Sequence, residues 1–168
     1  MSFLHPLNQV LMQITSWKIQ GCSNTLKIRL LRRRIEKEKY GIFFQQETKC
    51  TGEELSSIAW KVWKGCESVA IDSRGAVGGL VILWNSWEVN LSYFLETPFT
   101  LSAYFHILGT RIKGLVTNVY GPPRVEKKLA FLDSITDIKE IFEDKAWILG
   151  EEFNLIRNLD EKKVVYGT

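Results

Sequence analysis

The stretch Gly41-Ile42-Phe43-Phe44-Gln45-Gln46-Glu47-Thr48-Lys49 decides the fold class of this chain. Its centre is a short apolar run that follows a glycine, and its end is polar and charged. A run this short is typical of a buried strand, because a helix needs a longer periodic segment. We therefore predict a buried strand over residues 42–46 that ends directly before Glu47.

The segment before this strand supplies its first neighbours. Residues 10–21 are rich in β-branched and aromatic side chains and end at a glycine, which predicts a strand. Residues 23–25 offer a helix cap, and apolar residues then recur on one face among arginines and lysines up to Lys39. Residues 10–46 thus form a strand–helix–strand unit, and such units usually pair their strands in parallel.

Downstream, short strand-like runs alternate with two further helical segments. A short helical piece is predicted near Glu53–Ala59, and an amphipathic helix over Arg124–Phe142. Apolar runs broken by Gly, Pro, Asn or Ser predict strands at 60–71, 79–84, 89–94, 100–108, 111–120 and 146–149. Their close spacing favours antiparallel hairpins, especially around Gly109-Thr110. The predicted fold class is α/β, with helices packed on a partly antiparallel sheet.

Length and composition fit one globular domain. The chain has 168 residues, of which 45% are hydrophobic and 24% charged, and this balance excludes a disordered tail. Residues 1–9 look like an irregular leader, so we expect the domain to span residues 10–168. The three cysteines form no metal-binding pattern, no secretion signal begins the chain, and no apolar run is long enough to cross a bilayer. We expect an intracellular protein, cytoplasmic or nuclear, without membrane association.

The charge of the chain is mildly basic. Its net charge is +3 and its isoelectric point is about 8.7, which is compatible with a polyanionic partner but does not indicate one by itself. The densest basic cluster, on the first predicted helix, includes Arg32, Arg33 and Arg34. Its plainer interpretation is the solvated face of a helix, and contact with a nucleic-acid backbone is the alternative.

Polar side chains follow several predicted strands at the point where each strand ends. They lie at residues 16–18, 46–49, 118–122 and 150–154. The ends of buried strands are where α/β proteins usually place their sites. The carboxylates of Glu47 and Glu152 would suit a hard cation such as Mg²⁺, which prefers oxygen ligands. Each acid taken alone also has a plainer interpretation as an exposed loop residue.

Five short motifs occur along the chain in an order that bears on its family. They are Ser16-Trp17-Lys18-Ile19-Gln20-Gly21, Phe44-Gln45-Gln46-Glu47-Thr48-Lys49, Gly78-Gly79-Leu80, Val119-Tyr120-Gly121-Pro122 and Ile148-Leu149-Gly150-Glu151-Glu152-Phe153-Asn154. Together they resemble the endonuclease/exonuclease/phosphatase superfamily, whose fold is DNase I-like. Within it the chain looks most similar to the endonuclease domain of plant LINE-type retrotransposons. The resemblance covers residues 12–163, and five ordered motifs are far more specific than one.

The resemblance implies a partial DNase I-like four-layer α/β sandwich with mixed, largely antiparallel sheets. It also implies hydrolysis of DNA phosphodiester bonds by metal-activated water, with Mg²⁺ or Mn²⁺ as the cofactor. By motif, Glu47 corresponds to the metal-binding glutamate, and Tyr120 to a tyrosine that helps to position the phosphate. Asn154 corresponds to an asparagine that orients the scissile group, and Glu152 stands where the superfamily has an aspartate. Such a set can neutralise charge that develops on a phosphate under attack.

Three departures from the superfamily pattern bear on activity. Lys18 stands where the superfamily has an asparagine, so an amide is replaced by a positive charge. Glu151 stands where a glycine is expected, and Glu152 moves its carboxylate by one methylene, a shift on the scale that costs about 100-fold in rate. No Ser-Asp-His motif follows Asn154, so we expect the domain to lack its C-terminal part.

Three interpretations therefore stay open. The first is a magnesium-dependent endonuclease of a LINE-like retroelement that acts on DNA. The second is a catalytically inactive, truncated remnant of such an element, with weak nucleic-acid contact through the basic helix. The third is a phosphatase of the same superfamily, although the sequence of residues 156–162 speaks against it.

Overall fold

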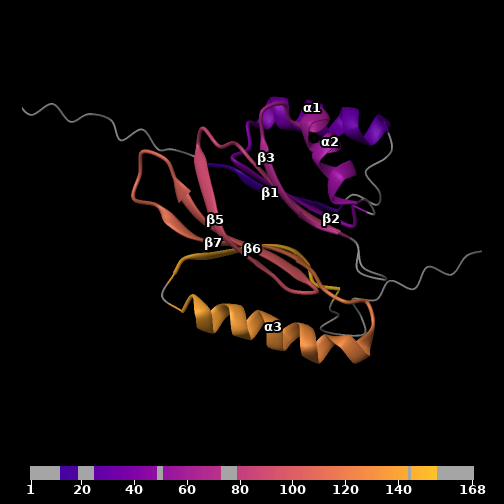
Figure 1. The fold of residues 1–168 in the computed structure, drawn as a ribbon, viewed down its shortest axis with the longest axis vertical. Coiled ribbons are helices and arrows are strands. Elements are labelled where there is room, and N and C mark those ends of the chain that lie inside the picture. The colour runs from indigo at the N-terminus through magenta and orange to yellow at the C-terminus, as the bar shows by residue number, and fades with distance from the viewer. Residues whose placement is uncertain (1–11, 19–24, 49–50, 73–78, 144, 155–168) are drawn as a thin grey trace, which may run out of the picture.

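The computed structural model describes residues 12–18, 25–48, 51–72, 79–143 and 145–154. Figure 1 shows four layers, in which two helices, two facing β-sheets and a third helix follow one another across the molecule. This arrangement confirms the predicted partial DNase I-like α/β sandwich. The predicted leader over residues 1–9 and the segment after Asn154 lie outside the described residues.

The first sheet has the strand order β1-β2-β4-β3. The bounds of its strands are β1 Ile14–Lys18, β2 Ile42–Gln46, β3 Glu67–Ile71 and β4 Leu80–Trp84. Strands β1 and β2 are parallel, and α1 (Thr25–Glu38) lies between them in the chain, so the predicted strand–helix–strand unit is confirmed. Strand β4 pairs antiparallel with both β2 and β3.

The second sheet has the strand order β5-β6-β7-β8. The bounds of its strands are β5 Val89–Glu96, β6 Thr100–Ile107, β7 Lys113–Tyr120 and β8 Trp147–Glu152. Strands β5, β6 and β7 are antiparallel neighbours, which confirms the hairpin predicted around Gly109-Thr110. Strand β8 pairs parallel to β7. Both sheets are therefore mixed, with antiparallel pairs in the majority.

Helices cover the outer faces of both sheets (Figure 1). Helices α1 and α2 (Gly52–Val62) lie on the first sheet, and α3 (Lys128–Ile141) lies on the second. A single 3-10 turn at Val125–Lys127 leads into α3, so the predicted helix over residues 124–142 begins with a tighter turn. Within the part of the chain that the structure describes, no helix is long and apolar enough to span a membrane.

The end of α2 corrects one expectation. The sequence predicts a strand over residues 60–71, whereas α2 continues to Val62 and only Glu67–Ile71 forms β3. Ala59 and Val62 are buried three residues apart, and Trp60 between them is 60% exposed. This spacing follows the period of a helix, so the run of large residues was misread as a strand.

Apolar side chains fill the space between each pair of layers. Because successive side chains of a strand point to opposite faces, Phe43 packs beneath α1 and α2 while Phe44 packs between the two sheets. A smaller cluster around Phe131 joins α3 to the second sheet. Cys66 belongs to the core beneath α1 and α2, and its burial raises the pKa of its thiol to about 11. The thiol is therefore protonated and unreactive at neutral pH.

Candidate active site

The C-terminal ends of two parallel strand pairs meet at one end of the sandwich. In the first sheet, Lys18 of β1 is the register partner of Gln46 of β2, and Glu47 follows directly. In the second sheet, Tyr120 of β7 is the register partner of Glu152 of β8. The Tyr120 hydroxyl donates a hydrogen bond to Glu47 Oε1 and so joins the two sheet ends.

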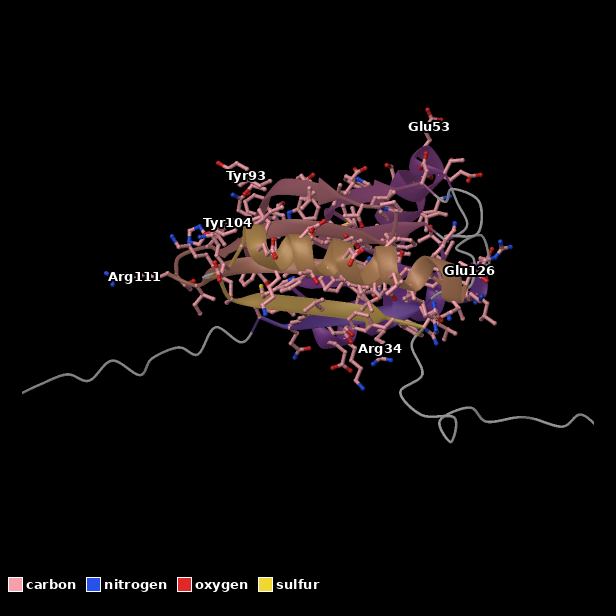
Figure 2. All side chains as sticks on the ribbon, turned by 90° about the horizontal axis from the view of Figure 1, so that it is seen from below. Arg34, Glu53, Tyr93, Tyr104, Arg111 and Glu126 are labelled. Carbon is pink, nitrogen blue, oxygen red and sulfur yellow. The ribbon has the colours of Figure 1, made fainter. Side chains whose placement is uncertain are left out.

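Figure 2 shows which end of the molecule this is. Glu126, which follows the C-terminal end of β7, lies at the opposite end from Arg111, which precedes β7. The aromatic pair of exposed Tyr93 and half-buried Tyr104, whose ring centroids are 6.4 Å apart, lies toward the Arg111 end. The polar strand ends are therefore gathered on the Glu126 side, away from that pair.

Lys18 and Glu47 form an ion pair in the centre of this site. The Lys18 ammonium lies 3.4 Å from Glu47 Oε1, and the two side chains are 34% and 13% exposed. The same ammonium lies 5.8 Å from the centroid of the Tyr120 ring. One carboxylate oxygen thus meets a hydroxyl donor and a cation at once. Tyr120 itself is buried, so the ion pair forms the solvent-facing part of the site.

Asn154 lies next to this group. Its side-chain amide donates to the carbonyl oxygen of Gly121, the residue after Tyr120, over 2.7 Å. Asn154 and Glu47 have backbone φ angles of 51° and 55°, in the left-handed region that residues with a Cβ rarely adopt. Such backbone strain collects at functional sites, where the surrounding structure has to maintain it. The site therefore contains two of the strained residues of the described chain.

Beneath the ion pair, a buried polar network crosses the space between the sheets. Gln46 donates from its side-chain amide to Ser16 Oγ over 2.7 Å and to Asn118 Oδ1 over 2.6 Å. Asn118 donates in turn to the backbone carbonyls of Gln45 and Val81, over 2.9 and 2.8 Å. The network therefore ties β1, β2 and β4 to β7, directly below Glu47 and Tyr120.

The sequence motifs do not indicate a role for this network. Gln46 and Asn118 were seen only as members of longer motifs, and both are essentially inaccessible to solvent. A signal was nevertheless present, because a buried amide in an otherwise apolar strand needs hydrogen-bond partners. What the sequence lacks is the partner, since the two residues are separated by 72 positions.

The structure describes the backbone of Glu152 but not its side chain. Its Cα position lies at the end of β8, beside Tyr120, in register with the site. The predicted role of the Glu152 carboxylate therefore stays a prediction. Glu47, Tyr120 and Lys18 are brought together by direct contacts, and Asn154 adjoins them through Gly121.

The three arginines proposed to contact nucleic acid lie on α1, and two of them have partners within the protein. Arg32 pairs with Glu36 one turn away, over 2.9 Å. Arg34 lies 5.1 Å from the ring of Trp17 and donates to the hydroxyl of Tyr40, a hydrogen bond that raises the pKa of Arg34 further. Arg33 is exposed. Arg34 therefore helps to hold α1 against β1.

The side chains that the structure describes do not by themselves form a divalent-metal site. Mg²⁺ and Mn²⁺ need several oxygen ligands and usually more than one carboxylate. Among the residues that the structure describes, no three His, Cys, Asp or Glu side chains are grouped so that they could hold a metal ion. The one described carboxylate of the site, Glu47, already lies against a lysine ammonium, which would repel a metal cation.

Comparison with known proteins agrees with this architecture. No protein-family model matches the sequence, and no curated protein matches it. Among solved structures, an endonuclease/exonuclease/phosphatase family protein from Bacteroides thetaiotaomicron has a TM-score of 0.68 at 14% identity, over 85% of this chain and 63% of that one. The endonuclease domain of TRAS1, a telomere-specific non-LTR retrotransposon, has a TM-score of 0.66 at 15% identity, over 87% and 62%.

A third solved structure extends the range of functions among these neighbours. A mannosyl-6-phosphatase from Bacteroides thetaiotaomicron has a TM-score of 0.65 at 15% identity, over 85% of this chain and 65% of that one. The chain therefore spans less than two thirds of the length of each of these three structures. Identities this low establish the fold alone. This chain has the α/β sandwich fold of endonuclease/exonuclease/phosphatase proteins.

Proposed function

We propose that this chain carries the phosphodiester site of an endonuclease-type domain, and that its ligand is DNA. The observation that carries this proposal is the convergence of Lys18, Glu47, Tyr120 and Asn154 at the C-terminal ends of the strands. In open α/β sheets this is where ligands are usually bound. The site combines a cation and an amide with a carboxylate, a set that can hold a phosphate group beside a proton acceptor.

Each residue has a proposed part in DNA hydrolysis. Asn154 would orient the scissile phosphate with its amide, and Tyr120 would hold the carboxylate of Glu47 in place. Glu47, together with Glu152, would handle the proton of the attacking water. Mg²⁺ or Mn²⁺, if bound when DNA is present, would supply charge neutralisation at the phosphate, and Glu152 is the further acid available for it. The motif resemblance implies metal binding for Glu47 and phosphate positioning for Tyr120, and the roles proposed here add the contact between these two side chains.

The biological context is proposed more narrowly as a LINE-like retroelement. The motif order and the charged segment at residues 155–162 support it, as does the fold likeness to the TRAS1 endonuclease domain. The likeness to a mannosyl-6-phosphatase keeps a phosphate monoester as a competing substrate. Both DNA and a sugar phosphate are therefore tested as substrates.

The ion pair between Lys18 and Glu47 favours a second candidate function, which is DNA binding without hydrolysis. A carboxylate held by an ammonium and a hydroxyl is less available to a metal or to a water proton. The chain would then be a catalytically inactive remnant of the retroelement domain that keeps its affinity for phosphodiesters. Only a combined assay of cleavage and binding separates the two candidates.

Nicking of supercoiled plasmid tests the hydrolytic function. The purified chain is incubated with plasmid in Mg²⁺, in Mn²⁺ and in EDTA, beside the variants Glu47→Gln and Asn154→Ala. Glu140→Gln on α3, an exposed acid far from the site, is the matched control. Hydrolysis by this site predicts metal-dependent nicking that Glu47→Gln lowers by about 100-fold or more, because a positioned acid or base contributes on that scale.

The other possible results of these assays each exclude one of the candidate functions or the activity of the preparation. Nicking that is equal in EDTA and in Glu47→Gln would show that another protein in the preparation cuts the plasmid. Binding of a labelled duplex without nicking, weakened by Asn154→Ala, selects the non-catalytic candidate. Release of phosphate from mannose 6-phosphate with neither nicking nor duplex binding selects the phosphatase. A chain that neither binds nor cleaves any of these refutes the proposed function.

A further inference from the structure

The Lys18 side chain departs from the superfamily pattern and lies in direct contact with Glu47. Its ammonium lies 3.4 Å from the Glu47 carboxylate and 5.8 Å from the centroid of the Tyr120 ring. A cation that binds beside a carboxylate at the mouth of a site needs this same space. The ammonium group of Lys18, a residue of β1, therefore places a positive charge at the centre of the candidate site.

The geometry points to metal-independent recognition of a phosphate, in which the Lys18 ammonium holds the phosphate oxygens in the place of a divalent cation. The inference rests on the proposed function, because it takes the strand-end site to be the phosphodiester site. It concerns binding of the anion, and it holds whether or not the bound ester is cleaved.

Lys18 is suited to this part by its surroundings. An ammonium has three N–H donors, so it can contact Glu47 and a phosphate oxygen at the same time. Its side chain is 34% exposed, whereas that of Glu47 is 13% exposed. The positive member of the pair thus faces an incoming anion, and the negative member lies behind it. An anion that reaches the site meets the lysine first.

The same arrangement opposes a metal. A divalent cation that bound Glu47 would lie within a few ångströms of the ammonium, and like charges at this distance repel strongly where the site is shielded from water. Glu47 Oε1 also accepts the Tyr120 hydroxyl, so a metal would have to compete with two donors at one oxygen. Asparagine at position 18 would remove the repulsion and add an oxygen ligand.

Two measurements test the inference without relying on catalysis. The first is the affinity for a fluorescein-labelled DNA duplex, by anisotropy, in EDTA and in Mg²⁺. The second is the binding of Mn²⁺ alone, by electron paramagnetic resonance. The variants are Lys18→Asn, Lys18→Met, which keeps the apolar stem, and Lys18→Arg, which keeps the charge. Lys139→Asn on α3 is the charge-matched control.

We expect the natural chain to bind the duplex equally in both buffers. In EDTA, Lys18→Asn and Lys18→Met each lower the affinity about 10- to 100-fold, the usual worth of one charged hydrogen bond, while Lys18→Arg and Lys139→Asn keep it. Lys18→Asn alone regains affinity in Mg²⁺, and it binds Mn²⁺ at least about tenfold more tightly than the natural chain. Circular dichroism of each variant confirms that it is folded.

Two results would overturn the inference while the proposed function stands. One is duplex binding by the natural chain that requires Mg²⁺ and is weakened by Asn154→Ala. The other is binding in EDTA that Lys18→Asn and Lys18→Met leave unchanged although Asn154→Ala weakens it. If the natural chain binds no duplex in either buffer, the proposed function and the inference fall together.

Discussion

Asn118 shows how one buried side chain can hold the candidate site in shape. Its amide donates to two backbone carbonyls of the first sheet, those of Gln45 and Val81, and its oxygen accepts from Gln46. Tyr120 lies two residues further along β7, on the same face of the strand, and reaches Glu47. The hydrogen bonds of Asn118 thus fix the relative position of the two strands that carry this contact.

Replacing Asn118 by Leu should destabilise the protein strongly. The change removes three hydrogen bonds, takes the Asn118 donor away from two buried carbonyls and leaves the Gln46 amide with Ser16 as its remaining partner. Each buried polar group left unpaired costs about 1–3 kcal/mol, so we expect the free energy of unfolding to fall by at least about 3 kcal/mol. Urea denaturation followed by tryptophan fluorescence measures it.

Asn90→Leu on the edge strand β5 is the matched control, because this asparagine is exposed. We expect that variant to change the free energy of unfolding by less than about 0.5 kcal/mol. If Asn118→Leu were equally mild, the network would contribute nothing net to stability. The positioning role given to it here would then be lost.

At the scale of single elements, α2 shows which of its boundaries a local sequence signal can predict. Thr51 and Glu54 form a reciprocal capping box, in which each side chain accepts from the backbone N–H of the other. Both residues are close in sequence, and a capping box is readable from such spacing alone. The signal fixes where the helix begins, but it carries no information on where the helix ends.

Thr51→Ala should therefore lower the free energy of unfolding by about 1 kcal/mol, the usual effect of losing an N-cap. The cause is the loss of the acceptor for the Glu54 backbone N–H. Ser57→Ala in the same helix removes an equivalent hydroxyl from an exposed interior position. It should leave stability unchanged or raise it slightly, because alanine has the higher helix propensity. Thermal unfolding of the two variants side by side measures the difference, and equal values would contradict a capping role.

The strands give the complementary lesson at this scale. The parallel pairing of β1 with β2 and the hairpin of β6 with β7 were predictable, because each depends on neighbouring segments of the chain. The insertion of β4 between β2 and β3 was not predicted. Hydrophobic periodicity indicates where strands lie along the chain, and it does not encode the order in which they pair.

For the whole molecule, Gly150 marks a close contact between the two sheets. It lies in β8, and a Cβ at this position would overlap the ring of Phe44 from β2. Phe44 is fully buried in the core between the sheets. The absence of a side chain at Gly150 therefore allows the second sheet to pack closely against the first. This contact sets the distance between the strand ends of the two sheets.

Gly150→Ala should cost about 1–3 kcal/mol in the free energy of unfolding, as overpacked cores do. Phe44→Leu replaces the ring by a smaller side chain and should by itself lower the free energy of unfolding. The double variant should lose less than the sum of the two, by more than about 0.5 kcal/mol, because the smaller side chain makes room for the new methyl group. Chemical denaturation of all four proteins measures this coupling. Strict additivity would mean that Gly150 and Phe44 do not set the sheet separation.

The candidate site was predictable in part. Glu47, Tyr120 and Asn154 were identified because each follows or ends a strand in a recognisable motif, and the structure places them next to one another. The sequence shows a lysine at position 18, and the structure pairs that lysine with Glu47. The contact could not be established from sequence, since side-chain direction at a strand end depends on the loops and strands around it.

By itself, the sequence determined the features that depend on short stretches of chain. These are the apolar strand at 42–46, the basic helix after the first strand, the capping box of α2 and the motif at each strand end. The tertiary structure alone decided which distant residues meet. Tyr120 reaches Glu47 across 73 positions, and Gln46 reaches Asn118 across 72. Local patterns cannot specify such pairs, because they form only when two sheets bury their apolar faces against each other, and that burial is a property of the whole chain.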